Sequence, residues 1–150
     1  IAKYAAGLIL PDDFVYLDAG TTTGLMLEYL EGTQASLVTN AVSHAQTLAK
    51  MGIRVYLIGG ELKSSTEAVV GSQAMQAIQM YQGFFGTNGI AKREGFTTPD
   101  ANEAIVKSTA MKQCKDVYVL ADTTKFGQVS SVTFGEFADG CILTEEIPEE

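Results

Sequence analysis

The chain has 150 residues, 46% of them hydrophobic, and a formal net charge of −8. This length suits one domain, residues 1–150, with enough mass to bury a sizeable core. The acidic balance and the lack of a basic run argue against a nucleic-acid-binding face, because phosphate backbones bind clustered Lys and Arg. No apolar run approaches the length of a membrane span and no signal peptide is visible, so we expect a cytoplasmic protein without membrane contact.

Cysteine and histidine usage argues against a metal centre. Cys114 and Cys141 lack the C-x-x-C spacing, so we expect small buried thiols in a reducing compartment, with a structural disulfide as the less favoured alternative. A single histidine leaves no His/Cys cluster for zinc. The sequence therefore predicts no metal and no cofactor.

Strand-like and helical patterns alternate through the first half of the chain. It opens at Ile1 inside a helical pattern and without an initiator methionine, so we expect a fragment of a longer protein. Asn40 stands where an N-cap should, ahead of a helix over residues 41–51, and Gly52 follows as the left-handed residue that ends it. The other elements expected here are strands over residues 14–17, 36–39 and 53–58, the last covered on both faces, and a helix over residues 24–31 with Met26, Leu27 and Leu30 on one side.

The second half continues the alternation, and its clearest signal is a helix start near Thr98. Asp100 can cap the amide of the third helical residue, while Glu103 can reach back to the N–H of the cap. Small and apolar residues then recur at helical spacing, which predicts a buried face made of Ala101, Ala104, Ile105, Ser108 and Met111. The other elements expected are a helix over residues 72–81 and strands over residues 84–86, 116–120 and 142–143.

This alternation predicts an α/β fold, a mostly parallel Rossmann-like sheet with helices on both faces. In such sheets ligands lie outside the carboxyl ends of the strands. The segments that leave the expected strand ends are all rich in Gly, Thr, Asn, Asp or Lys, and they span residues 18–23, 39–40, 59–60, 86–89 and 121–127. These five segments can converge on one pocket.

The first of these segments is the most informative stretch of the chain. The run Val15-Tyr-Leu-Asp-Ala-Gly-Thr-Thr-Thr-Gly24 has the order of a strand, a tight turn and a helix N-terminus. Backbone N–H groups and threonine hydroxyls at that point can hold a phosphate, which the helix dipole also favours. The run matches neither a Walker A loop nor a dinucleotide fingerprint. Taken alone, an ordinary structural turn rich in Gly and Thr explains it as well.

Considered together, the polar segments resemble the C-terminal effector-sensing domain of DeoR-family bacterial transcriptional regulators. The matching pieces occur in family order and cover nearly the whole chain. They are Leu17-Asp-Ala-Gly-Thr-Thr, Val38-Thr-Asn, Leu57-Ile-Gly-Gly60, Gly86-Thr-Asn-Gly-Ile90, Gly95-Phe-Thr-Thr-Pro-Asp-Ala-Asn-Glu103 and Leu120-Ala-Asp-Thr-Thr-Lys-Phe-Gly127. The resemblance implies a DNA-binding helix-turn-helix domain before the sensor, and this domain is not part of the sequence.

The resemblance also implies a fold like that of ribose-5-phosphate isomerases, glucosamine-6-phosphate deaminases and coenzyme A transferases, with a pocket for a phosphorylated sugar or polyol. Gly20, Thr21, Thr22 and Thr23 match the phosphate-binding loop of the isomerases. Lys125 matches the lysine of their Ala-Asp-x-Ser-Lys segment, and Glu103 matches the glutamate that opens the corresponding helix.

One departure from the isomerases concerns the chemistry. They place aspartates after their Gly-Ala in the segment that matches Gly86-Thr-Asn-Gly89, and proton transfer between sugar carbons needs such a carboxylate. Here the positions hold Asn88 and Gly89, neither of which can take up a proton. The resemblance thus implies a pocket that is kept and a catalytic function that is lost, so no catalytic residue is expected.

For several candidate ligand residues a structural role competes with ligand binding. Asp18 is expected to hold its own turn through backbone N–H groups more readily than to contact an anion, which it would repel. Asn40 and Glu103 are already explained as capping residues. Gly60 either ends a strand or lets the backbone approach a ligand closely. The full ligand-binding set predicted is Asp18, Gly20, Thr21, Thr22, Thr23, Asn40, Gly60, Asn88, Glu103 and Lys125.

The sequence thus predicts a non-catalytic sensor of a DeoR-type regulator, a repressor of sugar-metabolism genes released from DNA by a phosphorylated sugar. Regulators that read palindromic sites are symmetric oligomers, so a homo-dimer or homo-tetramer is expected. Two alternatives stay open. One is a sugar-phosphate isomerase or deaminase, and the other is an oligomerisation module whose pocket has degenerated.

Overall fold

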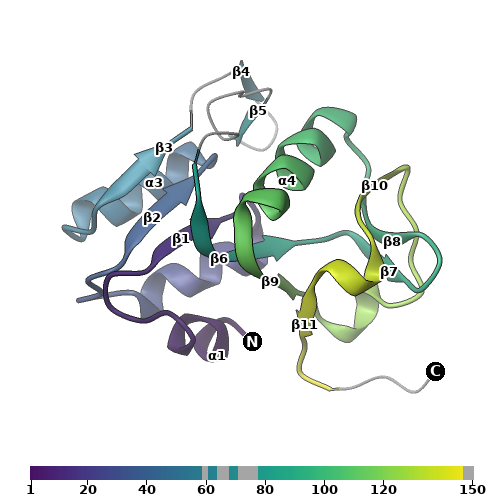
Figure 1. The fold of residues 1–150 in the computed structure, drawn as a ribbon, viewed down its shortest axis with the longest axis horizontal. Coiled ribbons are helices and arrows are strands. Elements are labelled where there is room, and N and C mark those ends of the chain that lie inside the picture. Colours follow the sequence, from purple (N-terminus) through teal and green to yellow (C-terminus); the bar gives the residue numbers. More distant parts are fainter. Residues whose placement is uncertain (59–60, 64–67, 71–77, 147–150) are drawn as a thin grey trace.

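The computed structural model describes residues 1–58, 61–63, 68–70 and 78–146, with the backbone alone for 61–63 and 68–70 (Figure 1). The α-helices are α1 (Ala2–Gly7), α2 (Thr21–Gly24), α3 (Val42–Lys50) and α4 (Ala101–Gln113), and the 3₁₀ helices are η1 (Leu25–Tyr29), η3 (Thr123–Lys125) and η4 (Phe137–Asp139). The strands are β1 (Phe14–Leu17), β2 (Ser36–Thr39), β3 (Val55–Leu57), β4 (Glu61–Lys63), β5 (Ala68–Val70), β6 (Met80–Gly86), β7 (Gly89–Ala91), β8 (Gly95–Thr98), β9 (Cys114–Leu120), β10 (Val132–Gly135) and β11 (Cys141–Leu143).

A six-stranded sheet in the order β11-β9-β6-β1-β2-β3 forms the centre of the fold. Every neighbouring pair in it is parallel. Parallel strands need crossover connections that lie on the faces of the sheet, and helices supply most of them here. The predicted fold class is therefore confirmed.

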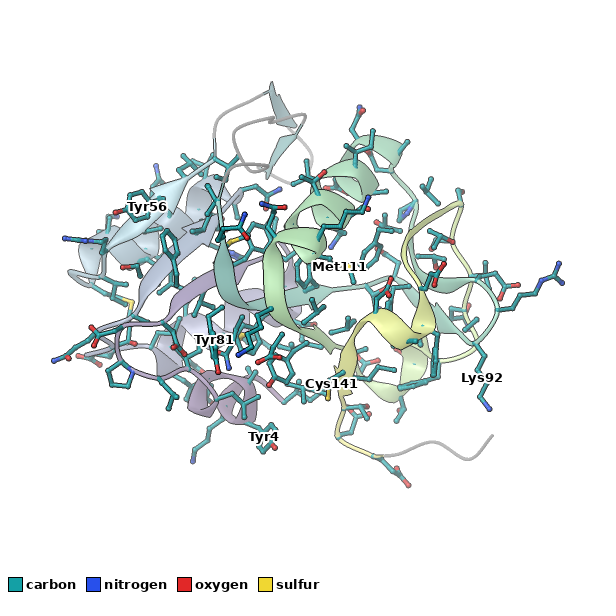
Figure 2. All side chains as sticks on the ribbon, viewed as in Figure 1. Tyr4, Tyr56, Tyr81, Lys92, Met111 and Cys141 are labelled. Atoms are coloured by element: carbon teal, nitrogen blue, oxygen red, sulfur yellow. The ribbon has the colours of Figure 1, made fainter. Side chains whose placement is uncertain are left out.

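Two hydrophobic cores lie on opposite faces of this sheet. On one face α4 packs over Tyr16, Val38 and Phe85 through Ala104 and Ala110. On the other face α1, η1 and α3 cover Val15, Leu17, Leu37, Phe84 and Leu120 through Ala5, Met26 and Leu48. Alternate residues of β1 point to opposite cores, as a strand with both faces covered requires. In Figure 1 α4 crosses one face of the sheet, and Figure 2 shows Met111 on the inner side of this helix.

Two antiparallel units supplement the parallel sheet. Strands β10, β8 and β7 form a three-stranded sheet in that order, and β4 pairs with β5. The β7–β8 hairpin extends beyond the carboxyl end of β6, with Lys92 at its tip (Figure 2). Gly95 enters β8 with φ +79, and a Cβ there would lie 2.2 Å from the carbonyl oxygen of Gly135 in β10. Only glycine allows the two strands to approach this closely.

The expectation of a doubly covered strand over residues 53–58 is wrong. Strand β3 spans Val55–Leu57 only and is the outermost strand of the sheet. Tyr56 and Leu57 are 46% and 47% exposed, and Figure 2 shows Tyr56 at this outer edge. Of this apolar run, Ile53 and Ile58 at the two ends are buried.

The helix expected over residues 72–81 is also wrong at its end. Residues 72–77 lie outside the described residues, while Met80 and Tyr81 belong to β6. This strand begins four residues earlier than expected and pairs with β9 from Met80 opposite Cys114 to Gly86 opposite Leu120. Pairing along a central strand, which is a tertiary property, overrides the local helical pattern.

The remaining differences concern helix surfaces and the thiols. The helix after the first turn begins at Thr21 and becomes 3₁₀ at Leu25, although Met26, Leu27 and Leu30 are buried as expected. In α4, Ile105 is 60% exposed and Ala101 is also exposed, whereas Val106, Lys107 and Ala110 are buried. Cys114 and Cys141 are free thiols, as expected, but Cys141 is exposed on the edge strand β11.

No helix in the described part of the chain is both long and apolar enough to cross a membrane.

Candidate functional site

The carboxyl ends of β9, β6, β1 and β2 lie next to one another in the sheet, and the predicted ligand segments follow directly from them. Residues 18–23 follow β1, residues 86–89 end and follow β6, and residues 121–127 follow β9. Neighbouring strands are about 4.8 Å apart, so the starts of the first and last of these segments are separated by roughly 10 Å. Gly60 lies outside the described residues.

The turn after β1 closes on itself through one of its threonines. The buried Thr23 hydroxyl donates to the carbonyl oxygens of Asp18, at 2.7 Å, and Gly20, at 3.3 Å. Thr21 is exposed and Thr22 is half-buried at the N-terminus of α2, where the first N–H groups have no partner within the helix. Thr23 thus shapes the turn, and Thr21 and Thr22 carry its more accessible hydroxyls.

Asp18 is buried and its carboxylate is engaged by protein groups. Its Oδ2 accepts the N–H of Gly86 at 3.1 Å, on the neighbouring strand β6. The same oxygen forms an ion pair with Lys107, which is 7% exposed in the middle of α4. Burial raises the pKa of the Asp18 carboxyl, and the Lys107 ammonium and the Gly86 N–H oppose that rise. Asp18 holds the backbone N–H of Ala19 in its own turn, as expected, and also that of Gly86 on the next strand.

Sequence reasoning missed Lys107. The signal was present, because Lys107 stands three residues after Ala104 and four before Met111, on the face expected to be buried. Its ammonium also donates to the carbonyl oxygen of Gly86 at 3.0 Å and lies 5.0 Å from the centre of the Phe134 ring. A buried lysine needs such partners, and Asp18 is the acidic one.

Asn40 does not cap helix α3. The N-cap is Ala41, whose N–H is accepted by the Thr39 hydroxyl at 3.1 Å. Asn40 is 3% exposed, and its Oδ1 accepts the hydroxyl hydrogen of Tyr16 at 3.1 Å. Gly52, with φ +79, ends α3 as expected.

The remaining candidates are Asn88 and Lys125, in segments that follow β6 and β9, and Glu103 on α4. Asn88 is exposed, and its Oδ1 accepts the Thr98 hydroxyl at 3.2 Å. Glu103 is half-buried in the first turn of α4, where Asp100 accepts its N–H at 3.0 Å and caps the helix as expected. Lys125 is half-buried at the end of η3. Its loop is tied to β7 by the Gly127 N–H, which donates to the Ile90 carbonyl oxygen at 2.8 Å.

His44 of α3 also lies against the turn after β1. A Cβ at Gly24 would come within 2.9 Å of His44 Nε2, so a larger residue there would require the imidazole to move. His44 Nδ1 is buried and has no hydrogen-bond partner among the described residues, and burial lowers the pKa of the ring.

Two hollows of the surface do not coincide with this edge. One of about 410 Å³ is lined by Asp12, Thr33, Ser36 and Arg54, at the opposite, amino end of β1 and β2. The other, of about 300 Å³, lies between η1 and α3 behind the turn and is lined by Leu25, Leu27 and Met51. Within the described residues, no three His, Cys, Asp or Glu side chains gather where they could hold a metal ion.

Comparison with known protein families gives a match over nearly the whole chain. The sequence profile described as the DeoR C terminal sensor domain matches residues 1–145.

Curated relatives carry the names of transcriptional regulators. The chain is 42% identical, over 153 residues, to the uncharacterized HTH-type transcriptional regulator FruR of Bacillus subtilis, covering 99% of the chain and 61% of that protein. It is 30% identical to the HTH-type transcriptional repressor GlcR of Bacillus subtilis, covering 100% of the chain and 60% of the relative. Identity to the lactose phosphotransferase system repressor of Staphylococcus epidermidis is 31%, with 97% and 60% covered. The chain thus spans about 60% of the length of these relatives.

Solved structures share the fold at low sequence identity. Ribose 5-phosphate isomerase A from Methanocaldococcus jannaschii matches with a TM-score of 0.61 and 13% identity, over 83% of this chain and 51% of the isomerase. The delta subunit of eIF2B from Chaetomium thermophilum matches with a TM-score of 0.61 and 21% identity, over 84% and 47%. These similarities establish the Rossmann-like fold and nothing about activity.

Proposed function

The chain belongs to the family of DeoR C-terminal sensor domains, and from this premise we propose that it binds a phosphorylated sugar at the carboxyl edge of its parallel sheet. The observation that carries the proposal is the convergence of the turn at Thr21 and Thr22, the segment at Asn88 and the loop at Lys125 on three consecutive strands. Together they offer N–H groups, hydroxyls, an amide and an ammonium, which are the donors that a phosphate and sugar hydroxyls require.

We propose a sensor without catalytic activity. The segment that would supply the isomerase carboxylate carries Asn88 and Gly89 instead. A Cβ at Gly89 would lie 2.2 Å from the carbonyl oxygen of Gln128, so this backbone leaves no room for a carboxylate side chain at that position. The isomerase alternative then lacks a proton acceptor where the resemblance would place one.

The proposed mechanism is linkage between ligand binding and DNA binding. A metabolite that binds one arrangement of the sensor more tightly shifts the attached DNA-binding domains by no more than its differential affinity. In the whole regulator we propose a helix-turn-helix domain, an operator site on DNA and a homo-dimer or homo-tetramer. The names of the relatives, which are regulators and repressors, support this placement.

A thermal-unfolding panel tests the binding function. The chain is heated with fructose 1-phosphate, fructose 6-phosphate, glucose 6-phosphate, galactose 6-phosphate or ribose 5-phosphate, each paired with its unphosphorylated sugar. A ligand present at about 100 times its Kd should add about 2.7 kcal/mol to the free energy of unfolding. Stabilisation by one phosphorylated sugar and not by its parent supports the sensor, whereas flat curves throughout favour the oligomerisation module. Turnover of ribose 5-phosphate or glucosamine 6-phosphate would restore the enzyme alternative.

A further inference from the structure

Both polar groups of the Gly86 residue are bound by one buried ion pair. The Gly86 N–H donates to Asp18 Oδ2 at 3.1 Å, and the Gly86 carbonyl oxygen accepts from Lys107 Nζ at 3.0 Å. Asp18 and Lys107 are bonded to each other and are 1% and 7% exposed. Gly86 is the last residue of β6, so this pair fixes the point at which the chain leaves the sheet.

The pair joins three segments that carry predicted ligand residues. Asp18 begins the turn that leads to Thr21 and Thr22, Gly86 leads into Asn88, and Lys107 is one helical turn after Glu103 on α4. We infer that Lys107 is a positioning residue of the ligand site, which holds the turn after β1, the segment after β6 and the first turn of α4 in register. This inference rests on the proposed function, because it assigns the role to the same site.

Stability alone does not account for a buried ion pair in this place. Well-packed apolar residues of similar volume stabilise a protein as much as a buried pair or more. Unlike apolar residues, Asp18 and Lys107 orient the Gly86 backbone, because Asp18 accepts its N–H and Lys107 donates to its carbonyl oxygen. The pair is also neutral overall, so the charge of a bound phosphate is left to Lys125 and to the N–H groups of the turn.

The experiment compares three variants of the chain. Lys107→Met removes the ammonium, and Lys112→Met removes an exposed lysine from the last turn of the same helix as the matched control. Asp18→Asn combined with Lys107→Met leaves no buried charge and keeps an oxygen that can accept the Gly86 N–H, so it covers the case in which Lys107→Met alone fails to fold.

The first readout needs no ligand. Amide hydrogen exchange, followed by NMR, reports local opening separately from global unfolding. In the Lys107 variants the protected amides of β2 should accelerate only by the loss of global stability measured in urea, whereas the Gly86 amide should accelerate by about a further tenfold or more. Equal acceleration of both sets of amides would mean that Lys107 only stabilises the fold, and this would overturn the inference.

The second readout is affinity for the sugar phosphate that gives the largest shift in the thermal-unfolding panel. The Lys107 variants should raise its Kd about tenfold or more, and Lys112→Met should change it by less than about twofold. Unchanged affinity in a folded Lys107 variant would overturn the inference. If the wild-type chain binds none of the panel, the proposed function fails, and the Gly86 exchange pattern alone then decides whether Lys107 positions this edge.

Discussion

The Asp18–Lys107 pair allows a stability prediction that depends on what each charge keeps when the other is removed. Lys107→Met leaves the carboxylate buried with backbone N–H donors alone, and truncating one partner of a buried pair costs about 3–5 kcal/mol. Asp18→Asn leaves the ammonium on the Gly86 carbonyl oxygen and over the Phe134 ring. Because these contacts stabilise a cation, we expect Asp18→Asn to lower the free energy of unfolding by about 3 kcal/mol, the lower end of that range.

The double variant should lose less free energy of unfolding than Lys107→Met alone. No charge is then buried, and the remaining loss is the unsatisfied carbonyl oxygen of Gly86, which costs about 1–3 kcal/mol. The two single losses add up to about 6–8 kcal/mol and exceed the loss of the double variant by about 3–7 kcal/mol, which is the coupling energy we expect between Asp18 and Lys107.

Urea titration of the four proteins measures this cycle, with urea chosen because it does not screen charge. Far-ultraviolet circular dichroism and tyrosine fluorescence should give coincident transitions, which justifies two-state free energies. A double variant that loses the full sum of the two single losses would refute the reasoning. Such additivity would mean that the two charges do not interact in the folded chain.

Three further predictions follow from single positions. Lys125→Ala should weaken binding of the active sugar phosphate by about 1.5–3 kcal/mol, or about 10- to 150-fold in Kd, as measured by calorimetry, and unchanged affinity would remove Lys125 from the site. Gly89→Ala places a Cβ 2.2 Å from the Gln128 carbonyl oxygen and should lower the free energy of unfolding in urea by about 1–3 kcal/mol. Gly7→Ala is the control and should not lower it, because a Cβ there meets no described residue within 4 Å outside its own helix and chain neighbours. Equal effects would contradict the crowding argument. Burial lowers the pKa of His44 from its ordinary 6.5, so the unfolded chain takes up this proton first as the pH falls. The contribution of His44 to stability is therefore complete above pH 6.5 and is lost as the pH falls through the folded-state pKa. His44→Gln should make the free energy of unfolding, measured in urea, decline less steeply below pH 6.5. A variant whose free energy of unfolding declines as steeply as that of the wild type would exclude His44 as a source of this pH dependence.

Much of the fold could be predicted from local patterns. The strands over residues 14–17 and 36–39, the Asp100 cap and the left-handed Gly52 match the structure residue for residue, because turn, cap and alternation signals lie within a few residues of the feature that they specify. The parallel sheet also followed, since alternating strands and helices restrict the connections to crossovers. The candidate ligand segments could be placed at one sheet edge for the same reason.

Only the tertiary structure determined the features that depend on residues far apart in the chain. Residues 53–58 look like a covered strand, yet β3 is the sheet edge, because strand order is not encoded locally. Residues 80 and 81 join β6 because β9 pairs with them from residue 114 onward. The spacing of Lys107 indicates a buried position, but its partner Asp18 lies 89 residues earlier in the chain and is identified only in the fold. The sequence by itself determined the candidate donor groups and the sheet edge that presents them. Only the folded chain decided which charges pair beside that edge, because Asp18 and Lys107 meet only when the chain folds and removes both from solvent.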